Sequence, residues 1–166
     1  MSGERIDTSK PLESVPPAAI LGRPQLLVFH INDNTDDQVL FQAACKKANV
    51  PIQWHVAESA ARGISYFESL VTLSKTQSVR WPDLVVLDIV MPAESGLKVL
   101  EFIRAKPELR LMPVIIFTGM PTAIQVDEAY RLGANSFLEK PHEFSEMVNL
   151  VASLYATWST CLRPSM

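Results

Sequence analysis

The segment PDLVVLDIVMP (82–92) decides the fold class of this chain. Its run 84–87 is short and wholly apolar, which is typical of a strand buried on both faces of a parallel sheet. Asp88 ends that run, and Met91-Pro92 follows as a turn. A carboxylate at the end of an apolar strand loses hydration and needs a compensating cation. The segment therefore predicts a buried strand with a functional carboxylate at its carboxyl end.

On both sides of this strand, the spacing of apolar residues alternates between that of a strand and that of a helix. Short apolar runs predict strands, and apolar residues at helical spacing between them predict helices, the first of which starts with a capping-box pattern at Thr35 and Gln38. Because parallel neighbours need crossover connections, five strands alternating with five helices predict a three-layer, doubly wound α/β domain with a parallel sheet. The other predicted strands are 26–31, 52–56, 114–117 and 136–138, and the later helices are 60–73, 97–104, 122–132 and 143–158.

Prolines and polar stretches outline the domain boundaries. Four of the twelve prolines fall within the first 24 residues, which predicts a flexible lead over 1–23, a domain over 24–158 and a tail over 159–166. The polar stretch 74–82 is long for a connection between a helix and a strand, which indicates an insertion. Trp81 within it is either a lid or partner contact or, as we favour, part of local packing.

The composition excludes several classes of protein. The chain has 166 residues, is 48% hydrophobic and carries a formal charge of −3, as expected of one soluble domain. Two cysteines are too few for a disulfide framework or a zinc site. The absence of a basic cluster argues against nucleic-acid binding, and no apolar run approaches the ~20 residues of a membrane helix. The N-terminus does not resemble a signal peptide, so we expect a cytoplasmic protein.

Polar residues gather at the predicted carboxyl ends of the strands, where open α/β sheets bind their ligands. Asn32 and Asp33 follow the first strand, and Thr118 and Lys140 end the fourth and fifth. Carboxylate and carbonyl oxygens suit a hard divalent ion, and the expected ion is Mg²⁺. Together with a hydroxyl and an ammonium, they would support phosphoryl transfer to the Asp88 carboxylate.

Four motifs, in this order, resemble the receiver domain of two-component response regulators. The resemblance covers residues 25–155 and implies a flavodoxin-like (βα)5 fold with strand order 2-1-3-4-5. It implies Asp88 as the phosphoacceptor, Asp33 as a direct ligand of Mg²⁺ or Mn²⁺, and the Val90 carbonyl as a further ligand. The motifs are INDNTDD (31–37), VVLDIVMP (85–92), IIFTGM (115–120) and FLEKP (137–141).

The resemblance also implies a set of switching residues. Thr118 is the hydroxyl that moves to the phosphoryl group, Lys140 is the ion partner of that group, and Phe137 is an aromatic switch. A cis peptide bond is expected between Lys140 and Pro141.

Two positions depart from the family pattern or modify it. Asn32 stands where the family carries a second acid; its amide can hold a metal-bound water but removes a negative charge, so we expect weaker Mg²⁺ binding. Val90 offers no side-chain hydrogen bond to an attacking water, which predicts slow self-dephosphorylation. His30 shares a strand face with Asn32, and we expect it to be a buried, hydrogen-bonded histidine rather than a metal ligand.

These observations predict a stand-alone receiver. A sensor histidine kinase or phosphotransfer protein would supply the phosphoryl group, and a downstream protein would detect the surface change. The face formed by the helix 122–132, the strand 136–138 and the helix 143–158 is the candidate surface for that partner or for a homodimer. The alternative is a pseudo-receiver, a binding module that is never phosphorylated. A phosphatase with an aspartate nucleophile is disfavoured because Val90 occupies the place of its second acid.

Overall fold

A computed structural model describes residues 25–161. Five parallel strands form one sheet in the order β2-β1-β3-β4-β5, so the predicted doubly wound fold is confirmed. The predicted lead 1–23 and the end of the predicted tail lie outside the described residues. The elements, in chain order, are β1 (Leu26–Ile31), α1 (Thr35–Lys47), β2 (Ile52–Ala57), α2 (Ala60–Ser74), β3 (Leu84–Leu87), α3 (Leu97–Ala105), β4 (Val114–Thr118), α4 (Ala123–Arg131), β5 (Ser136–Glu139) and α5 (Phe144–Trp158).

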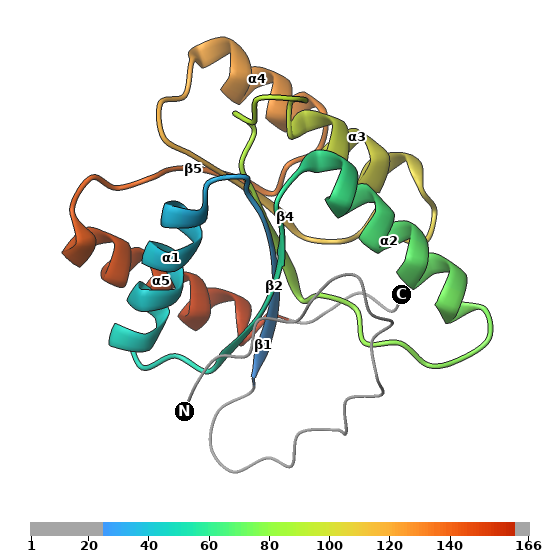
Figure 1. Cartoon of the computed structure of the whole chain (residues 1–166), viewed down its shortest axis with the longest axis horizontal. Helices are drawn as coiled ribbons and strands as arrows, with labels where there is room; N and C mark the ends of the chain where they lie inside the picture. Colours follow the sequence, from blue (N-terminus) through green and yellow to red (C-terminus); the bar gives the residue numbers. More distant parts are fainter. Residues whose placement is uncertain (1–24, 162–166) are drawn as a thin grey trace.

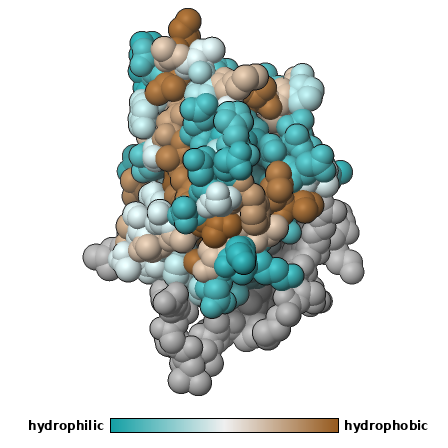
Figure 2. All heavy atoms as spheres, turned by 90° about the vertical axis from the view of Figure 1, so that its left-hand side faces the viewer, coloured by the Kyte–Doolittle hydropathy of each residue, from teal (hydrophilic) through white to brown (hydrophobic). Residues whose placement is uncertain are grey.

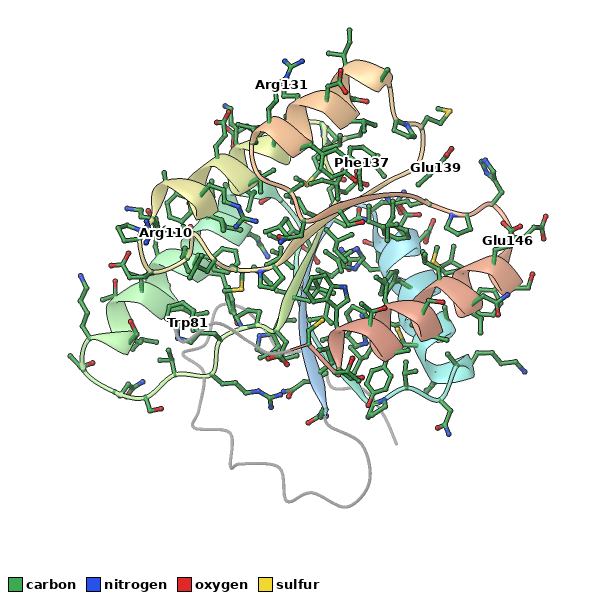
Figure 3. All side chains as sticks on the ribbon, turned by 180° about the vertical axis from the view of Figure 1, so that it is seen from behind. Trp81, Arg110, Arg131, Phe137, Glu139 and Glu146 are labelled. Carbon is green, nitrogen blue, oxygen red and sulfur yellow. The ribbon has the colours of Figure 1, made fainter. Side chains whose placement is uncertain are left out.

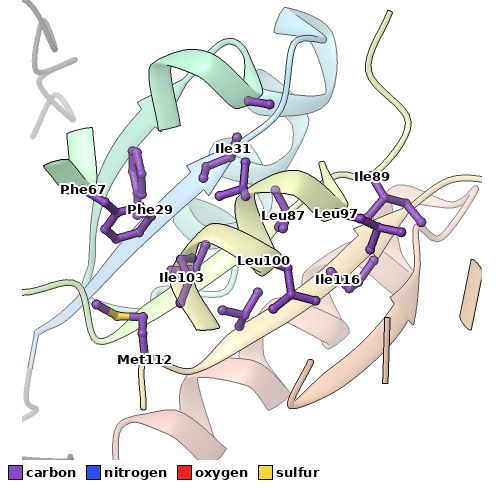
Figure 4. Packing of buried hydrophobic residues seen from close by; sticks show 14 of the residues in the cluster. Phe29, Ile31, Phe67, Leu87, Ile89, Leu97, Leu100, Ile103, Met112 and Ile116 are labelled. Atoms are coloured by element: carbon purple, nitrogen blue, oxygen red, sulfur yellow. The ribbon is translucent and has the colours of Figure 1, made fainter. Parts of the chain in front are cut away.

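The helices cover the sheet as two layers (Figure 1). Helices α1 and α5 pack on one face, where Phe41 and Val151 belong to one buried cluster. Helices α2, α3 and α4 pack on the other face, and the second cluster contains Phe67 and Leu100 (Figure 4). The three inner strands, β1, β3 and β4, are buried along their whole length because both faces of the sheet are covered there, as predicted from the run 84–87. In the described part of the chain, no helix is long and apolar enough to cross a membrane.

The first helix begins differently from its predicted capping box. Asn34 is the N-cap, and its side-chain oxygen accepts from the backbone N–H groups of Asp36 and Asp37. Thr35 is the first helical residue, and Gln38 donates instead to the Asn32 carbonyl at 2.7 Å. The prediction was wrong because Asn and Thr are both good caps and stand next to each other in the sequence.

The stretch 74–82 contains neither a helix nor a strand beyond its first residue. Arg80 ties it to the amino ends of neighbouring strands, donating to the Gln25 carbonyl at 3.2 Å and approaching the Gln53 side chain at 3.4 Å. Trp81 is partly buried and packs against the hydrophobic core. Local packing, the interpretation favoured from the sequence, is confirmed for Trp81.

The connection between α4 and β5 depends on one arginine and one glycine. Gly133 has a φ of 93°, a left-handed conformation that favours glycine after a helix. Arg104, on α3, donates to the Gly133 carbonyl from two nitrogens at 2.9 and 2.7 Å, and to the Met112 carbonyl at 2.8 Å. Helix α3 is thereby fixed to the segments that lead into β4 and into β5.

Candidate functional site

The candidate site lies at the carboxyl edge of the sheet, where β1, β3, β4 and β5 end. Asp88 follows β3 directly and is 5% exposed. Its backbone N–H donates to the Ile31 carbonyl at 2.9 Å, which continues the pairing of β3 with β1 and places Asp88 beside Asn32. The predicted carboxylate therefore is buried at the end of an apolar strand.

Among residues 25–161, each oxygen of the Asp88 carboxylate has one donor. The Val90 backbone N–H donates to Oδ1 at 2.9 Å, and the Lys140 ammonium donates to Oδ2 at 2.5 Å. A carboxylate oxygen has two lone pairs, so each oxygen retains one for a further ligand or for attack on an electrophile. The predicted pairing of Asp88 with Lys140 is present in the structure.

Lys140 is held in place by several elements. Its backbone N–H donates to the Thr118 carbonyl at 2.8 Å, and its ammonium lies 5.8 Å from the centroid of the Phe117 ring. The ammonium also donates to Asp37 Oδ2 at 2.6 Å, so it is shared between two carboxylates. Asp37, in the first turn of α1, was not predicted as a site residue. Acidic residues are common in a first helical turn because the helix dipole stabilises negative charge there. Asp37 therefore gave no sign in the sequence of its contact with Lys140.

The peptide bond between Lys140 and Pro141 is not cis. No cis peptide bond occurs within residues 25–161, so this expectation was wrong. The trans form of an X-Pro bond is favoured by only about 0.5–1 kcal/mol, and a motif alone gives a weak basis for choosing the isomer.

Thr118 and Phe137 lie beside the contact between Asp88 and Lys140. Their side chains face the helical layer formed by α2, α3 and α4. Thr118 is fully buried, and its Oγ1 has no hydrogen-bond partner among the described residues. Phe137, on β5, is partly buried against the cluster beneath α3 and α4 (Figure 3). A buried hydroxyl without a partner is costly, so Thr118 holds an unused donor near Asp88 and Lys140.

Asn32 and Asp33 have different surroundings although they are adjacent. Asn32 is fully buried; its Oδ1 accepts from the Asn34 N–H at 2.8 Å, and its Nδ2 lies 3.5 Å from Asp37 Oδ2. Asp33 is half-buried, and its carboxylate makes no hydrogen bond or ion pair within residues 25–161. Asp33 is therefore a carboxylate that is free to bind a cation.

The donor set fits a hard divalent ion that keeps most of its water. No three His, Cys, Asp or Glu side chains of the described region gather closely enough to form a metal site by themselves. Mg²⁺ needs only one or two carboxylates in addition to water and phosphoryl oxygens. The unpaired Asp33 and the free lone pairs of Asp88 match that requirement, and the Val90 carbonyl remains a predicted third ligand.

A glycine controls the close approach of the loop that follows Asp88. The Gly96 N–H donates to the Ile89 carbonyl at 3.2 Å, which folds the loop back over the end of β3. A Cβ on Gly96 would lie well inside contact distance of the Asp88 carbonyl oxygen. Sequence reasoning missed Gly96 because glycine is common in loops before helices, whether or not a close backbone approach requires it.

His30 lies beneath the site on β1. It is buried, as predicted, but its Nε2 has no hydrogen-bond partner in the described part of the chain. Burial, assisted by the charge of Lys140, lowers the pKa of His30 to about 4, although Asp88 and Asp37 act in the opposite direction. The imidazole is therefore neutral near pH 7 and is not a cation that could compete with Lys140.

Comparisons with known proteins agree with this geometry. The family model "Response regulator receiver domain" matches residues 31–152. The chain is 23% identical over 135 residues to "Response regulator Rcp1" of Synechocystis sp., covering 81% of this chain and 90% of the relative. The structure of the "Phosphorylated Cyanobacterial Phytochrome Response Regulator RcpA" superposes with a TM-score of 0.73 at 24% identity, covering 86% of this chain and all of that one. The "Mn(2+)-bound form of response regulator Rcp1" superposes with a TM-score of 0.66 at 22% identity, covering 84% and 99%.

Proposed function

Because the chain belongs to the family of response regulator receiver domains, we propose that it accepts a phosphoryl group on Asp88 from a histidine kinase or a phosphotransfer protein. Members of this family are signalling domains rather than classical enzymes. The observation that carries the proposal is the contact between the Lys140 ammonium and a buried Asp88, each of whose oxygens keeps one lone pair that no donor among the described residues occupies. A downstream protein would then detect the change in surface that follows phosphorylation.

The transfer step requires no proton to be removed from the nucleophile. A lone pair of an Asp88 oxygen attacks phosphorus, a P–O bond forms, and the P–N bond of the donor phosphohistidine breaks. The electron pair of that bond stays on the imidazole nitrogen of the donor. Asp88 is suited to this role because a carboxylate, unlike a serine hydroxyl, is already ionised.

The negative charge of the phosphoryl group needs neighbours that are positive or can donate. Lys140 lies 2.5 Å from Asp88 and can donate to a phosphoryl oxygen attached there. Thr118 holds a buried hydroxyl with no present partner among the described residues, and donation to a phosphoryl oxygen would remove that cost. Asp33, Asp88 and the Val90 carbonyl would hold Mg²⁺ or Mn²⁺, which neutralises part of the phosphoryl charge when bound.

The signal would pass from Thr118 to the face of α4, β5 and α5. Movement of the Thr118 hydroxyl leaves space that the ring of Phe137 can fill, which is the kind of two-position packing that switching requires. On this face α4 exposes Ile124 and Tyr130, at 78% and 50%. Figure 2 shows hydrophilic residues with separate apolar patches between them, and exposed apolar patches are candidate contact points for a protein partner.

The partner class follows from the chemistry, and the neighbours suggest where to begin. One neighbour is described as a phytochrome response regulator, so a phytochrome-type histidine kinase is the first donor to test. We propose slow loss of the phosphoryl group, because Val90 has no polar side chain with which to orient a water. A half-life of seconds in the isolated protein would contradict this part of the proposal.

Incubation with Mg²⁺ and acetyl phosphate tests the proposal. We expect intact-mass spectrometry to detect an acid-labile adduct of one phosphoryl group, which Asp88→Asn abolishes while leaving the fold unchanged by circular dichroism. No adduct from acetyl phosphate or from any histidine kinase would refute phosphoryl acceptance. That result would favour the pseudo-receiver, the alternative to which the neutral Asn32 points.

A further inference from the structure

The contact between Asp37 and Lys140 adds an acid to the site that the motif does not contain. Lys140 Nζ lies 2.6 Å from Asp37 Oδ2 and 2.5 Å from Asp88 Oδ2. Asp37 comes from α1 and Asp88 from the end of β3, so one ammonium joins two elements across the sheet edge. The side chain of Lys140 is only 12% exposed, so both contacts are largely shielded from solvent.

Asn32 is the neighbour that allows Asp37 to occupy this place. The Oδ1 of Asn32 is occupied by the Asn34 N–H, which turns its Nδ2 toward Asp37 Oδ2 at 3.5 Å. A carboxylate at position 32 would bring an oxygen to that position, and two like charges so close repel each other. The amide at 32 and the carboxylate at 37 are therefore compatible, whereas two carboxylates there would oppose each other.

The total charge of the site is therefore the same as with an acid at position 32, although the acid stands at position 37 instead. Asp33, Asp37 and Asp88 carry three negative charges at this edge of the sheet, and Lys140, which contacts Asp37 and Asp88, carries one positive charge, so the formal charge is −2. An acid at position 32 with a neutral residue at position 37 would give the same total. The expectation of weaker Mg²⁺ binding rested on the loss of one negative charge at position 32. Asp37, on α1, supplies that charge instead.

We propose that Asp37 is a positioning residue that takes over the electrostatic role vacated at Asn32, attracting the divalent ion and holding Lys140 against Asp88. This inference rests on the proposed function of the site. Asn34 fixes Asp37 for the role by capping α1, since its Oδ1 accepts from the Asp37 N–H at 3.2 Å. Affinity for a hard cation rises with the number of charged ligands and neighbours, so the carboxylate at 37 acts on the ion without contacting it.

Asp37→Asn tests the inference, and Asp36→Asn is its matched control. Both variants remove one charge from the same helical turn, but Asp36 is exposed and makes no contact with Lys140. Isothermal titration calorimetry with Mg²⁺ and with Mn²⁺ should show affinity falling about tenfold for Asp37→Asn and less than about twofold for Asp36→Asn. Circular dichroism and thermal unfolding confirm that each variant is folded.

A second variant separates relocation of charge from a merely structural effect. Asn32→Asp, introduced into Asp37→Asn, returns an acid to the end of β1 and should recover affinity to within about threefold of the unmodified chain. If the double variant stays as weak as Asp37→Asn, or if Asp37→Asn matches Asp36→Asn, the inference is refuted.

The same measurements distinguish the inference from the proposed function. If the unmodified chain binds Mg²⁺ and takes a phosphoryl group from acetyl phosphate while Asp37→Asn matches its control, only the role of Asp37 is overturned. If the unmodified chain neither binds Mg²⁺ nor takes a phosphoryl group, the proposed function fails and the role of Asp37 fails with it.

Discussion

The buried imidazole of His30 should make the stability of this domain depend on pH. The ring is fully buried among aromatic side chains, 5.2 Å from the Phe41 ring centroid and 6.2 Å from that of Trp54. Its pKa is lowered from 6.5 to about 4 by burial and by the charge of Lys140. Because the pKa is depressed in the folded state, the unfolded chain takes up a proton first as the pH falls below 6.5.

The size of the effect follows from the linkage between proton binding and unfolding. The contribution of neutral His30 to the free energy of unfolding is present at pH 7, declines between pH 6.5 and 4, and is lost below pH 4. The full difference corresponds to about 3 kcal/mol at roughly 1.4 kcal/mol for each pH unit. Between pH 7 and pH 5 the loss attributable to His30 is about 2 kcal/mol.

Urea unfolding at pH 7 and at pH 5 measures this loss, and His30→Phe isolates it. The phenyl ring keeps the aromatic packing and cannot titrate, so the variant should lose about 2 kcal/mol less than the unmodified chain between the two pH values. His142→Gln removes an exposed histidine and should lose as much stability as the unmodified chain. If the unmodified chain and His30→Phe lose the same free energy of unfolding between pH 7 and pH 5, the conclusion that burial keeps His30 neutral is refuted.

Two further substitutions, each with a control, test loops at the two edges of the sheet: Gly96 lies beside the site, and Arg104 holds the segments that lead into β4 and β5. Gly96→Ala should destabilise the domain by about 2 kcal/mol and slow phosphorylation of Asp88, because the new methyl group meets a backbone oxygen; Gly119→Ala, where no atom lies within 4 Å of an added Cβ, should change thermal stability by less than about 0.5 kcal/mol. Arg104→Ala should cost about 2–3 kcal/mol in urea unfolding, because it leaves two backbone carbonyls without their charged donor. Arg131→Ala, which removes an arginine that is 80% exposed, should cost less than about 0.5 kcal/mol, and equal effects of the two arginine variants would contradict this account.

The sheet was predictable because its signals are local. A run such as Leu84–Leu87 can be covered on both faces only in a sheet flanked by two helical layers, and crossover helices leave one sensible hand and direction for the strands. Boundaries were less certain because neighbouring residues compete as caps. Asn34 rather than Thr35 caps α1, since the Asn34 oxygen reaches two backbone N–H groups.

The site was predictable only where function coincides with the end of a strand. Asp88 follows β3 and Lys140 follows β5, so the parallel topology alone brings them to one edge of the sheet. Asp37 lies on a helix, and its contact with Lys140 spans 103 positions. No spacing rule distinguishes Asp37 from Asp36, since which acid faces the sheet depends on where α1 begins.

Asn32 shows why comparing a motif one position at a time and considering the folded site lead to different predictions for the affinity for Mg²⁺. Compared along the chain, the amide is a lost acid, and Mg²⁺ binding should weaken. In the fold, the same amide makes room 3.5 Å away for a carboxylate that already holds Lys140, and the charge near Asp88 is unchanged. A divalent ion responds to the charges around it and not to their order in the chain, so affinity should depend on the sum over positions 32 and 37. The comparison along the chain gives position 37 no role and predicts no effect of Asp37→Asn, whereas the folded site predicts that Asp37→Asn weakens Mg²⁺ binding and that an acid at position 32 restores it.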